Sequence, residues 1–103
     1  LSTMKIESNV DAVFFGFPAI CRSTEERDSL VKYLEEKEIE TRPIICGNMA
    51  RQPGLQRSPH KIIGTLAGAD SVMDKGLYWG VHPSFSDAEI QYIASCLKSF
   101  PWE

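Results

Sequence analysis

One stretch of the sequence, Ile39–Pro53, carries the side chains best suited to binding a charged ligand. A short β-branched run that includes an arginine breaks at a Gly-Asn turn, and the loop that follows presents amides and a second arginine. Guanidinium groups match the geometry of phosphate and carboxylate groups. The stretch therefore indicates an anion-binding loop, although an ordinary surface turn would have the same composition. The candidate ligand-binding residues are Arg42, Asn48, Arg51 and Gln52.

Other reactive side chains lack the partners that catalysis needs. Ser29 and Lys32 have the S-x-x-K spacing of some serine acyl enzymes, but the companion motifs are missing and the pair falls within a helical pattern. His60 and His82 are capable of acid–base chemistry, yet a structural role explains each of them more simply. We expect Cys46, beside a glycine turn, to be inert. The sequence therefore predicts no catalytic residue in this chain.

The composition is that of one small globular domain. The 103 residues are 43% hydrophobic, which suits a single modest core. A net charge of −3 with mixed signs argues against nucleic-acid binding. No apolar run reaches the roughly 18 residues that a membrane span needs, and no signal peptide is evident. Three widely spaced cysteines with no zinc-type spacing favour reduced thiols, no metal site and a cytoplasmic location.

Hydrophobic patterning predicts strands and helices that alternate along the chain. Capping boxes at Ser23–Glu26 and Ser86–Glu89 mark two helix starts, and Gly16 and Pro18 give the first strand a bulge or an edge position. The predicted strands span residues 12–21, 40–45 and 77–81, and the predicted helices span residues 24–37, 62–76 (broken by glycines) and 87–100. This order predicts an α+β, two-layer sandwich of a small, mainly antiparallel sheet and helices.

The first and third predicted strands are apolar on both faces. Tyr78 and Trp79 must point to opposite faces of a strand, so we expect one to lie in the core and the other to face a partner. The strands over residues 12–20 and 78–81 are therefore expected to leave an exposed apolar patch. Residues 1–11 show no pattern, and because the chain begins with Leu1 we expect it to be part of something longer.

Six segments carry a common pattern in order along the chain: Phe15–Pro18, Leu30–Leu34, Ile39–Pro53, Ala69-Asp70, Gly76–Pro83 and Ser86–Ile93. Together they resemble the DegT/DnrJ/EryC1/StrS family of pyridoxal-phosphate-dependent sugar aminotransferases. The resemblance covers about residues 12–100. It implies the C-terminal small domain of fold-type I transferases over residues 12–103, with residues 1–11 as an irregular leader and the large cofactor-binding domain absent.

The resemblance also implies a cofactor, a substrate and roles for the candidate residues. Pyridoxal phosphate (PLP) would be held by the missing large domain, and the substrate would be a nucleotide-linked 4-keto-6-deoxy sugar used in lipopolysaccharide synthesis by a homodimer. Arg42 would face the cleft, and Asn48, Arg51 and Gln52 would lie near the sugar or its pyrophosphate. Gly47-Asn48 with Arg51–Pro53 looks more like the nucleotide-sugar 3-dehydratase branch, with amino transfer left open.

Less specific alternatives remain for the residues and for the chain. Arg42 would pair with Glu40 if its role were structural, and Asn48 would then be a turn residue at positive φ. A free-standing, non-catalytic ligand-binding or interaction module is the alternative function.

Overall fold

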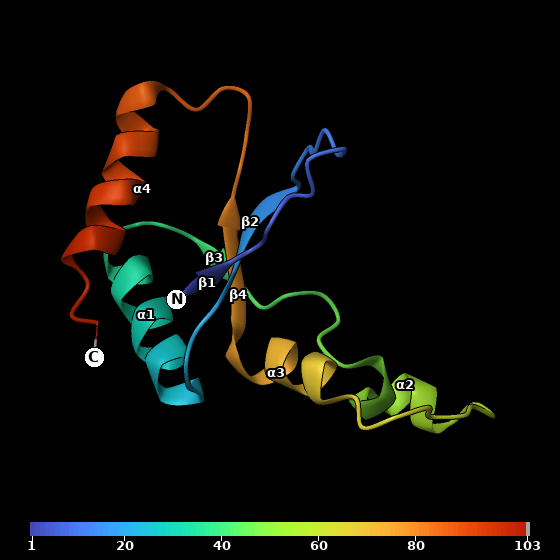
Figure 1. Cartoon of the computed structure of the whole chain (residues 1–103). Helices are drawn as coiled ribbons and strands as arrows, with labels where there is room; N and C mark the ends of the chain where they lie inside the picture. Colours follow the sequence, from blue (N-terminus) through green and yellow to red (C-terminus); the bar gives the residue numbers. More distant parts are fainter. Residues whose placement is uncertain (103) are drawn as a thin grey trace.

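A four-stranded antiparallel sheet, with two helices packed on one face, forms the body of the domain (Figure 1). The computed structural model describes residues 1–102. The strand order is β1-β2-β4-β3, and the α+β architecture predicted from the sequence is confirmed. The elements are β1 (Ser2–Thr3), β2 (Gly16–Ile20), α1 (Thr24–Glu36), β3 (Thr41–Arg42), the 3₁₀ helix η1 (Met49–Arg51), α2 (Pro53–Gln56), α3 (Ala67–Lys75), β4 (Gly76–Gly80) and α4 (Asp87–Ser99).

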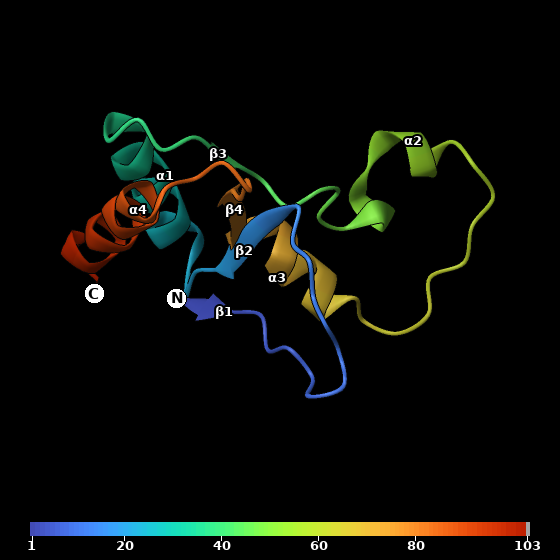
Figure 2. The same cartoon turned by 90° about the horizontal axis from the view of Figure 1, so that it is seen from above.

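The core lies between the sheet and helices α1 and α4, which cover the same face in both views (Figures 1 and 2). Residues alternate between the two faces of a strand, so β2 and β4 contribute every second residue to this layer. Leu30 and Leu34 on α1 are completely buried there, as the predicted apolar stripe requires. The sheet and α4 supply Ala19, Leu77, Trp79, Cys96 and the adjoining Phe100.

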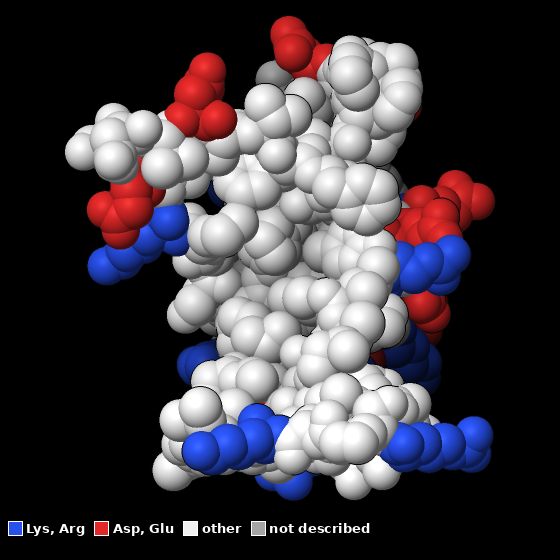
Figure 3. All heavy atoms as spheres, turned by 90° about the vertical axis from the view of Figure 1, so that its right-hand side faces the viewer, with Lys and Arg blue, Asp and Glu red and all other residues white. Residues whose placement is uncertain are grey.

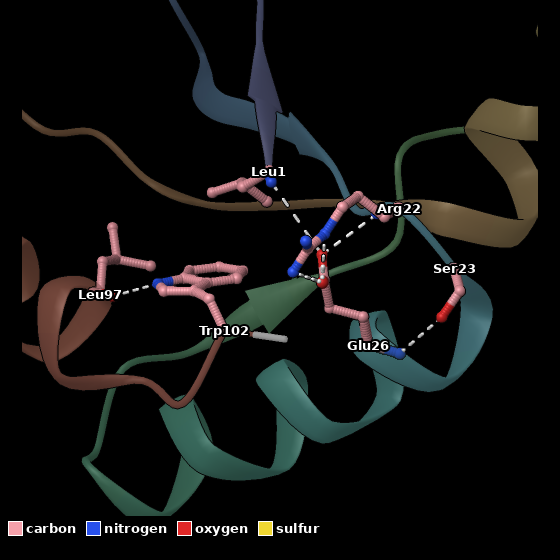
Figure 4. Close-up of polar contacts among 6 residues, drawn as sticks. All are labelled: Leu1, Arg22, Ser23, Glu26, Leu97 and Trp102. Atoms are coloured by element: carbon pink, nitrogen blue, oxygen red, sulfur yellow. Dashed lines mark hydrogen bonds and ion pairs between the residues drawn. The ribbon is translucent and has the colours of Figure 1, made fainter.

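Helix α1 begins at its predicted cap, but only half of the predicted capping box forms. The Ser23 hydroxyl accepts a hydrogen bond from the Glu26 backbone amide at 3.1 Å (Figure 4). The Glu26 carboxylate binds Arg22 instead of the Ser23 amide, at 3.1 Å from the Arg22 backbone nitrogen and 2.8 Å from its Nε. These bonds to Arg22 hold the pKa of the Glu26 carboxyl below its usual value. The arginine side chain is a stronger partner because it is charged.

Helix α4 has the complete capping box that the sequence predicts. The Ser86 hydroxyl accepts from the Glu89 amide at 3.3 Å, and the Glu89 carboxylate accepts from the Ser86 amide at 2.7 Å. The helix ends before Pro101, as expected. Beyond it, the indole of Trp102 donates to the Leu97 carbonyl at 2.8 Å and fixes the returning chain (Figure 4).

The strands differ from the predicted ones in length. The second predicted strand is only two residues long, since Pro43 has no amide to continue the ladder. Residues 1–11, expected to be irregular, contribute β1, which pairs with Ala19 and Ile20. Pro18 lies beyond that pairing, so one side of β2 is an edge there, in line with the prediction for this proline.

A segment that we call the arm, residues 46–66, projects from the side of the sheet opposite α1 and α4 (Figures 1 and 2). The sequence predicted a loop after the Gly47-Asn48 turn and a helix from about residue 62, but the loop contains η1 and α2 and the helix begins later. Pro53 begins α2, because proline suits the first position of a helix. Helix α3 begins only at Ala67, after Gly64 and Leu66 adopt positive φ angles of 79° and 56°.

Within residues 1–102, no helix combines the length and the apolar character needed to cross a membrane.

Candidate functional site

The face of the sheet opposite α1 and α4, which we call the open face, carries Arg42. Strand register places Arg42 directly across from Tyr78, and Tyr78 across from Pro18. Paired residues lie on the same side of an antiparallel sheet, so these three side chains and Ile20 share the open face. Trp79 lies on the other side, in the core, which confirms that the two neighbouring aromatic residues separate.

The open face is broad and uncharged in its middle. Figure 3, which views the side bearing the open face and the arm, shows Lys, Arg, Asp and Glu gathered at the margins. The segment leading into β2 adds large apolar groups, since Val13 is 96% exposed and Phe15 is 84% exposed. Phe15 lies 6.0 Å from the ring of Tyr78, and Val81 is also exposed. The predicted exposure of apolar residues at 12–20 and 78–81 is confirmed.

Arg42 lies at the β3 edge of this face and makes an exposed ion pair with Glu40. The pair is the structural alternative that the sequence left open for this arginine. Arg42 also lines a groove of about 670 Å³ whose walls include Tyr78, His82 and Phe15. Exposed ion pairs stabilise proteins little, so the guanidinium is available to exchange Glu40 for another anionic group.

The arm brings Asn48 and Arg51 together on a single carboxylate, that of Asp70 in the first turn of α3. The Asn48 amide nitrogen donates to Asp70 Oδ1 at 2.7 Å. Arg51 donates from Nε to Oδ1 and from Nη2 to Oδ2, both at 3.1 Å. Hydrogen bonds from Arg51 and then from Asn48 hold the pKa of the Asp70 carboxyl below its usual value. Asp70 is therefore an ionised group that anchors the arm to α3.

Asn48 itself is buried, with 2% of its surface exposed. Its side-chain oxygen accepts from the Ala50 amide at 3.0 Å and so caps η1. Its φ is −101°, and the positive φ of this turn, 64°, belongs to Gly47. The turn-residue alternative for Asn48 thus placed the positive angle one residue too late. A Cβ on Gly47 would lie 2.7 Å from Met73 Cγ, so only glycine fits here.

Gln52 holds the other end of the turn. Its side-chain amide donates to the Cys46 carbonyl at 2.8 Å, across the Gly47 turn. Gln56, in α2, donates in turn to the Ala50 carbonyl. Asn48 and Gln52, the two amides expected to face a ligand, therefore stabilise the arm from within. Arg51 is the most exposed of the three candidate residues in the arm.

The four candidate residues do not form one cluster. Asn48 and Arg51 meet at Asp70, and Gln52 lies on the same turn. Arg42 lies on the open face. Of the two grooves described within residues 1–102, one contains Arg42 and neither contains Asn48. Direct contact of these residues with a substrate stays a prediction. Sequence reasoning missed Asp70, because 22 residues separate it from Asn48.

The remaining reactive residues have structural surroundings. His60 Nδ1 lies 2.8 Å from the Ser58 carbonyl oxygen, and His82 Nδ1 accepts from the Ser84 amide at 3.1 Å. The three cysteines are free thiols. Burial, and then the charge of Glu26, raises the pKa of the Cys21 thiol. Ser29 and Lys32 are exposed on α1.

Residues 1–102 do not fit a PLP-binding site. Such a site needs a base at the reactive carbon, a carboxylate at the pyridine nitrogen and donors for the phosphate. The lysines lie exposed at the surface except for the half-buried Lys75, so within these residues no lysine is enclosed as the base of such a site would be. Among the same residues, no group of three His, Cys, Asp or Glu side chains could hold a metal ion.

Comparison with known proteins gives consistent matches over nearly the whole chain. The model of the DegT/DnrJ/EryC1/StrS aminotransferase family matches residues 1–98. The "lipopolysaccharide biosynthesis protein RfbH" of Salmonella typhimurium is 32% identical over 92 residues, which cover 87% of this chain and 21% of that protein. The "dTDP-4-dehydro-2,6-dideoxy-D-glucose 3-dehydratase" of Saccharopolyspora spinosa is 33% identical over 93 residues, which cover 87% of this chain and 20% of that protein. The chain thus spans about a fifth of the length of these relatives.

Proposed function

Because the chain belongs to the DegT/DnrJ/EryC1/StrS aminotransferase family, we propose that it acts as the C-terminal small domain of a PLP-dependent enzyme. The enzyme modifies a nucleotide-linked 4-keto-6-deoxy sugar for lipopolysaccharide or other surface polysaccharide synthesis. The observation that carries the proposal is the open face, which leaves Phe15 exposed beside Tyr78, the residue that pairs with Arg42. A domain that functions alone seldom exposes such a surface.

In this proposal the work is divided between two domains. The large domain holds PLP, which supplies the electron sink for the reaction, together with the catalytic base. Residues 12–103 form the small domain that covers one side of the cleft, and residues 1–11 lead into it. The apolar part of the open face packs on the large domain. Arg42 and the arm then border the cleft, where they bind and orient the nucleotide sugar.

The reaction we favour is dehydration at C3. The support is the printed name of one relative, a 3-dehydratase, together with the Gly47-Asn48 turn and Arg51–Pro53 that resemble this branch. Amino transfer, the activity that the family is named for, is the second candidate. We place the enzyme in the cytoplasm as a homodimer, with no nucleic acid and no membrane as partner.

The cofactor test uses the full-length protein with PLP and a dTDP-linked 4-keto-6-deoxy sugar, the nucleotide named for one relative. The expected result is loss of the C3 hydroxyl of the sugar, detected by mass spectrometry. Replacement of the keto oxygen by an amino group, with glutamate as donor, identifies the aminotransferase instead. A full-length protein that binds no PLP, judged from its visible absorption spectrum, overturns the proposal and favours the non-catalytic binding module.

The substrate-binding role of Arg42 is tested in the same enzyme. If Arg42 holds a charged group, Arg42→Ala weakens substrate binding by about 1–3 kcal/mol, the range for a hydrogen bond to a charged group. The matched control is Lys98→Ala, which removes the same charge from exposed α4 on the helix-covered side. Equal KM values for wild type and Arg42→Ala return Arg42 to its structural pairing with Glu40.

A further inference from the structure

We propose that Asp70 is a positioning residue, which holds Arg51 so that the outer edge of its guanidinium group receives a phosphate of the ligand. The inference rests on the proposed function, because it assigns the phosphate to the nucleotide part of the sugar nucleotide. Asp70 does not itself touch the ligand. It acts through Arg51 and through Asn48, the two side chains that share its carboxylate.

The geometry of the ion pair leaves one edge of Arg51 open. A guanidinium group has five N–H donors. Asp70 binds the Nε–Nη2 edge, with both distances at 3.1 Å. Within residues 1–102, Nη1 donates to no protein group, and 55% of the side-chain surface is exposed. The carboxylate therefore fixes the plane of the guanidinium group and leaves the Nη1 donors for a ligand.

The same carboxylate also fixes the backbone that carries Arg51. Asn48 donates to Asp70 Oδ1 with its nitrogen and caps η1 with its oxygen, and η1 ends at Arg51. Both the main chain and the side chain of Arg51 are thus held from one point on α3. A long arginine side chain that is already ordered loses less entropy when a ligand binds.

This arrangement lets two effects of Asp70 on phosphate binding be distinguished: the positioning of Arg51 and the repulsion of the phosphate by the carboxylate charge. Asp70 is an anion close to the proposed phosphate, so Coulomb repulsion alone predicts tighter phosphate binding when its charge is removed. Positioning predicts the opposite, since Arg51 then loses the Nε–Nη2 clamp. The sign of the change in affinity distinguishes the two explanations.

The experiment measures binding of inorganic pyrophosphate to the full-length protein by calorimetry, with inorganic phosphate in parallel. We expect Asp70→Asn to weaken pyrophosphate binding about tenfold, the scale of one charge-assisted hydrogen bond. Arg51→Met weakens it at least as much. The matched control is Asp74→Asn, one turn further along α3, which removes the same charge but no hydrogen bond to Arg51 and leaves the affinity unchanged or slightly tighter.

The outcomes separate this inference from the proposed function. Unchanged or tighter pyrophosphate binding by Asp70→Asn overturns the positioning role, and so does wild-type binding that does not depend on Arg51. Either result leaves turnover of the nucleotide sugar intact as evidence for the proposed function. Conversely, a protein without PLP whose pyrophosphate affinity falls in Asp70→Asn and Arg51→Met supports the anion site while the enzyme assignment fails. Circular dichroism spectra of all variants check that each one folds.

Discussion

The two faces of the sheet are built by the same strands and have opposite surroundings. On one face, Ala19, Leu77 and Trp79 are sealed under α1 and α4. On the other, Ile20 and Tyr78 are only half-buried, although they alternate with those core residues along the same strands. The difference shows that alternation supplies two apolar faces but does not decide which is covered. The helices cover one, and the open face is left for a partner.

The comparison predicts that stability depends on the covered face and association on the open face. Burial of apolar area stabilises a fold roughly in proportion to the area removed from water. Large apolar side chains that remain exposed add to this stabilisation only when a second surface covers them. Substitutions on the two faces should therefore have effects of different kinds as well as different sizes.

The largest effect is expected for Leu34→Ala in α1. Leu34 is completely buried, so the truncation loses apolar burial and leaves a cavity. We expect the free energy of unfolding to fall by about 2–5 kcal/mol, measured by urea denaturation of the 103-residue chain. The matched control is Val13→Ala in the segment that leads into β2, at a position that is 96% exposed, for which we expect a change within about 0.5 kcal/mol. Similar losses for the two variants would remove the distinction between the faces.

A smaller effect, on association rather than folding, is expected for Phe15→Ser. The isolated chain should self-associate as its concentration rises, since the exposed aromatic group offers apolar area to a second copy. Removing it should weaken association by about 1.5–3 kcal/mol if the ring is buried in the contact. Sedimentation velocity over a range of concentrations measures this change. A chain that stays monomeric throughout contradicts the expected role of the open face.

The smallest effect concerns acid stability and the arm. The pKa of Asp70 is lowered in the folded chain, first by hydrogen bonds from Arg51. A lowered pKa stabilises the folded state at pH values above the usual carboxyl value of 3.8, and the stabilisation is lost as the pH falls through the folded-state pKa. The melting temperatures of wild type and Asp70→Asn should therefore differ most near neutral pH and converge in acid. A difference that stays constant down to pH 2 would sink this expectation.

Local signals in the sequence predict most of the body of the domain. The residues of the capping box, Ser86 and Glu89, are close in the sequence, and so are Leu30 and Leu34 of the apolar stripe, so the physical cause of each signal is visible locally. The strand at Gly76–Gly80 also follows from its own composition. The exposed apolar residues near Phe15 were predictable because that run is apolar at successive positions.

The arm and its contacts were not predictable in the same way. Asp70 binds partners 19 and 22 residues away, and no local pattern reports such a contact. The late start of α3 depends on a positive φ at Leu66, and a leucine in the sequence does not predict such an angle. The role assigned to Arg42 rests on family resemblance, since its local chemistry equally supports the pairing with Glu40 that is present.

The junction between α3 and β4 links the anchor of the arm to the open face. Helix α3 passes into β4 with no loop between Lys75 and Gly76, and a Cβ on Gly76 would lie 2.3 Å from the Val72 carbonyl oxygen. The backbone that carries Asp70 therefore passes directly into the strand that carries Tyr78, and the close approach at Gly76 leaves no room for a side chain at the turn between them. The proposed anion site at Arg51 and the surface against which a partner would rest are thus joined by continuous backbone, with no loop between them.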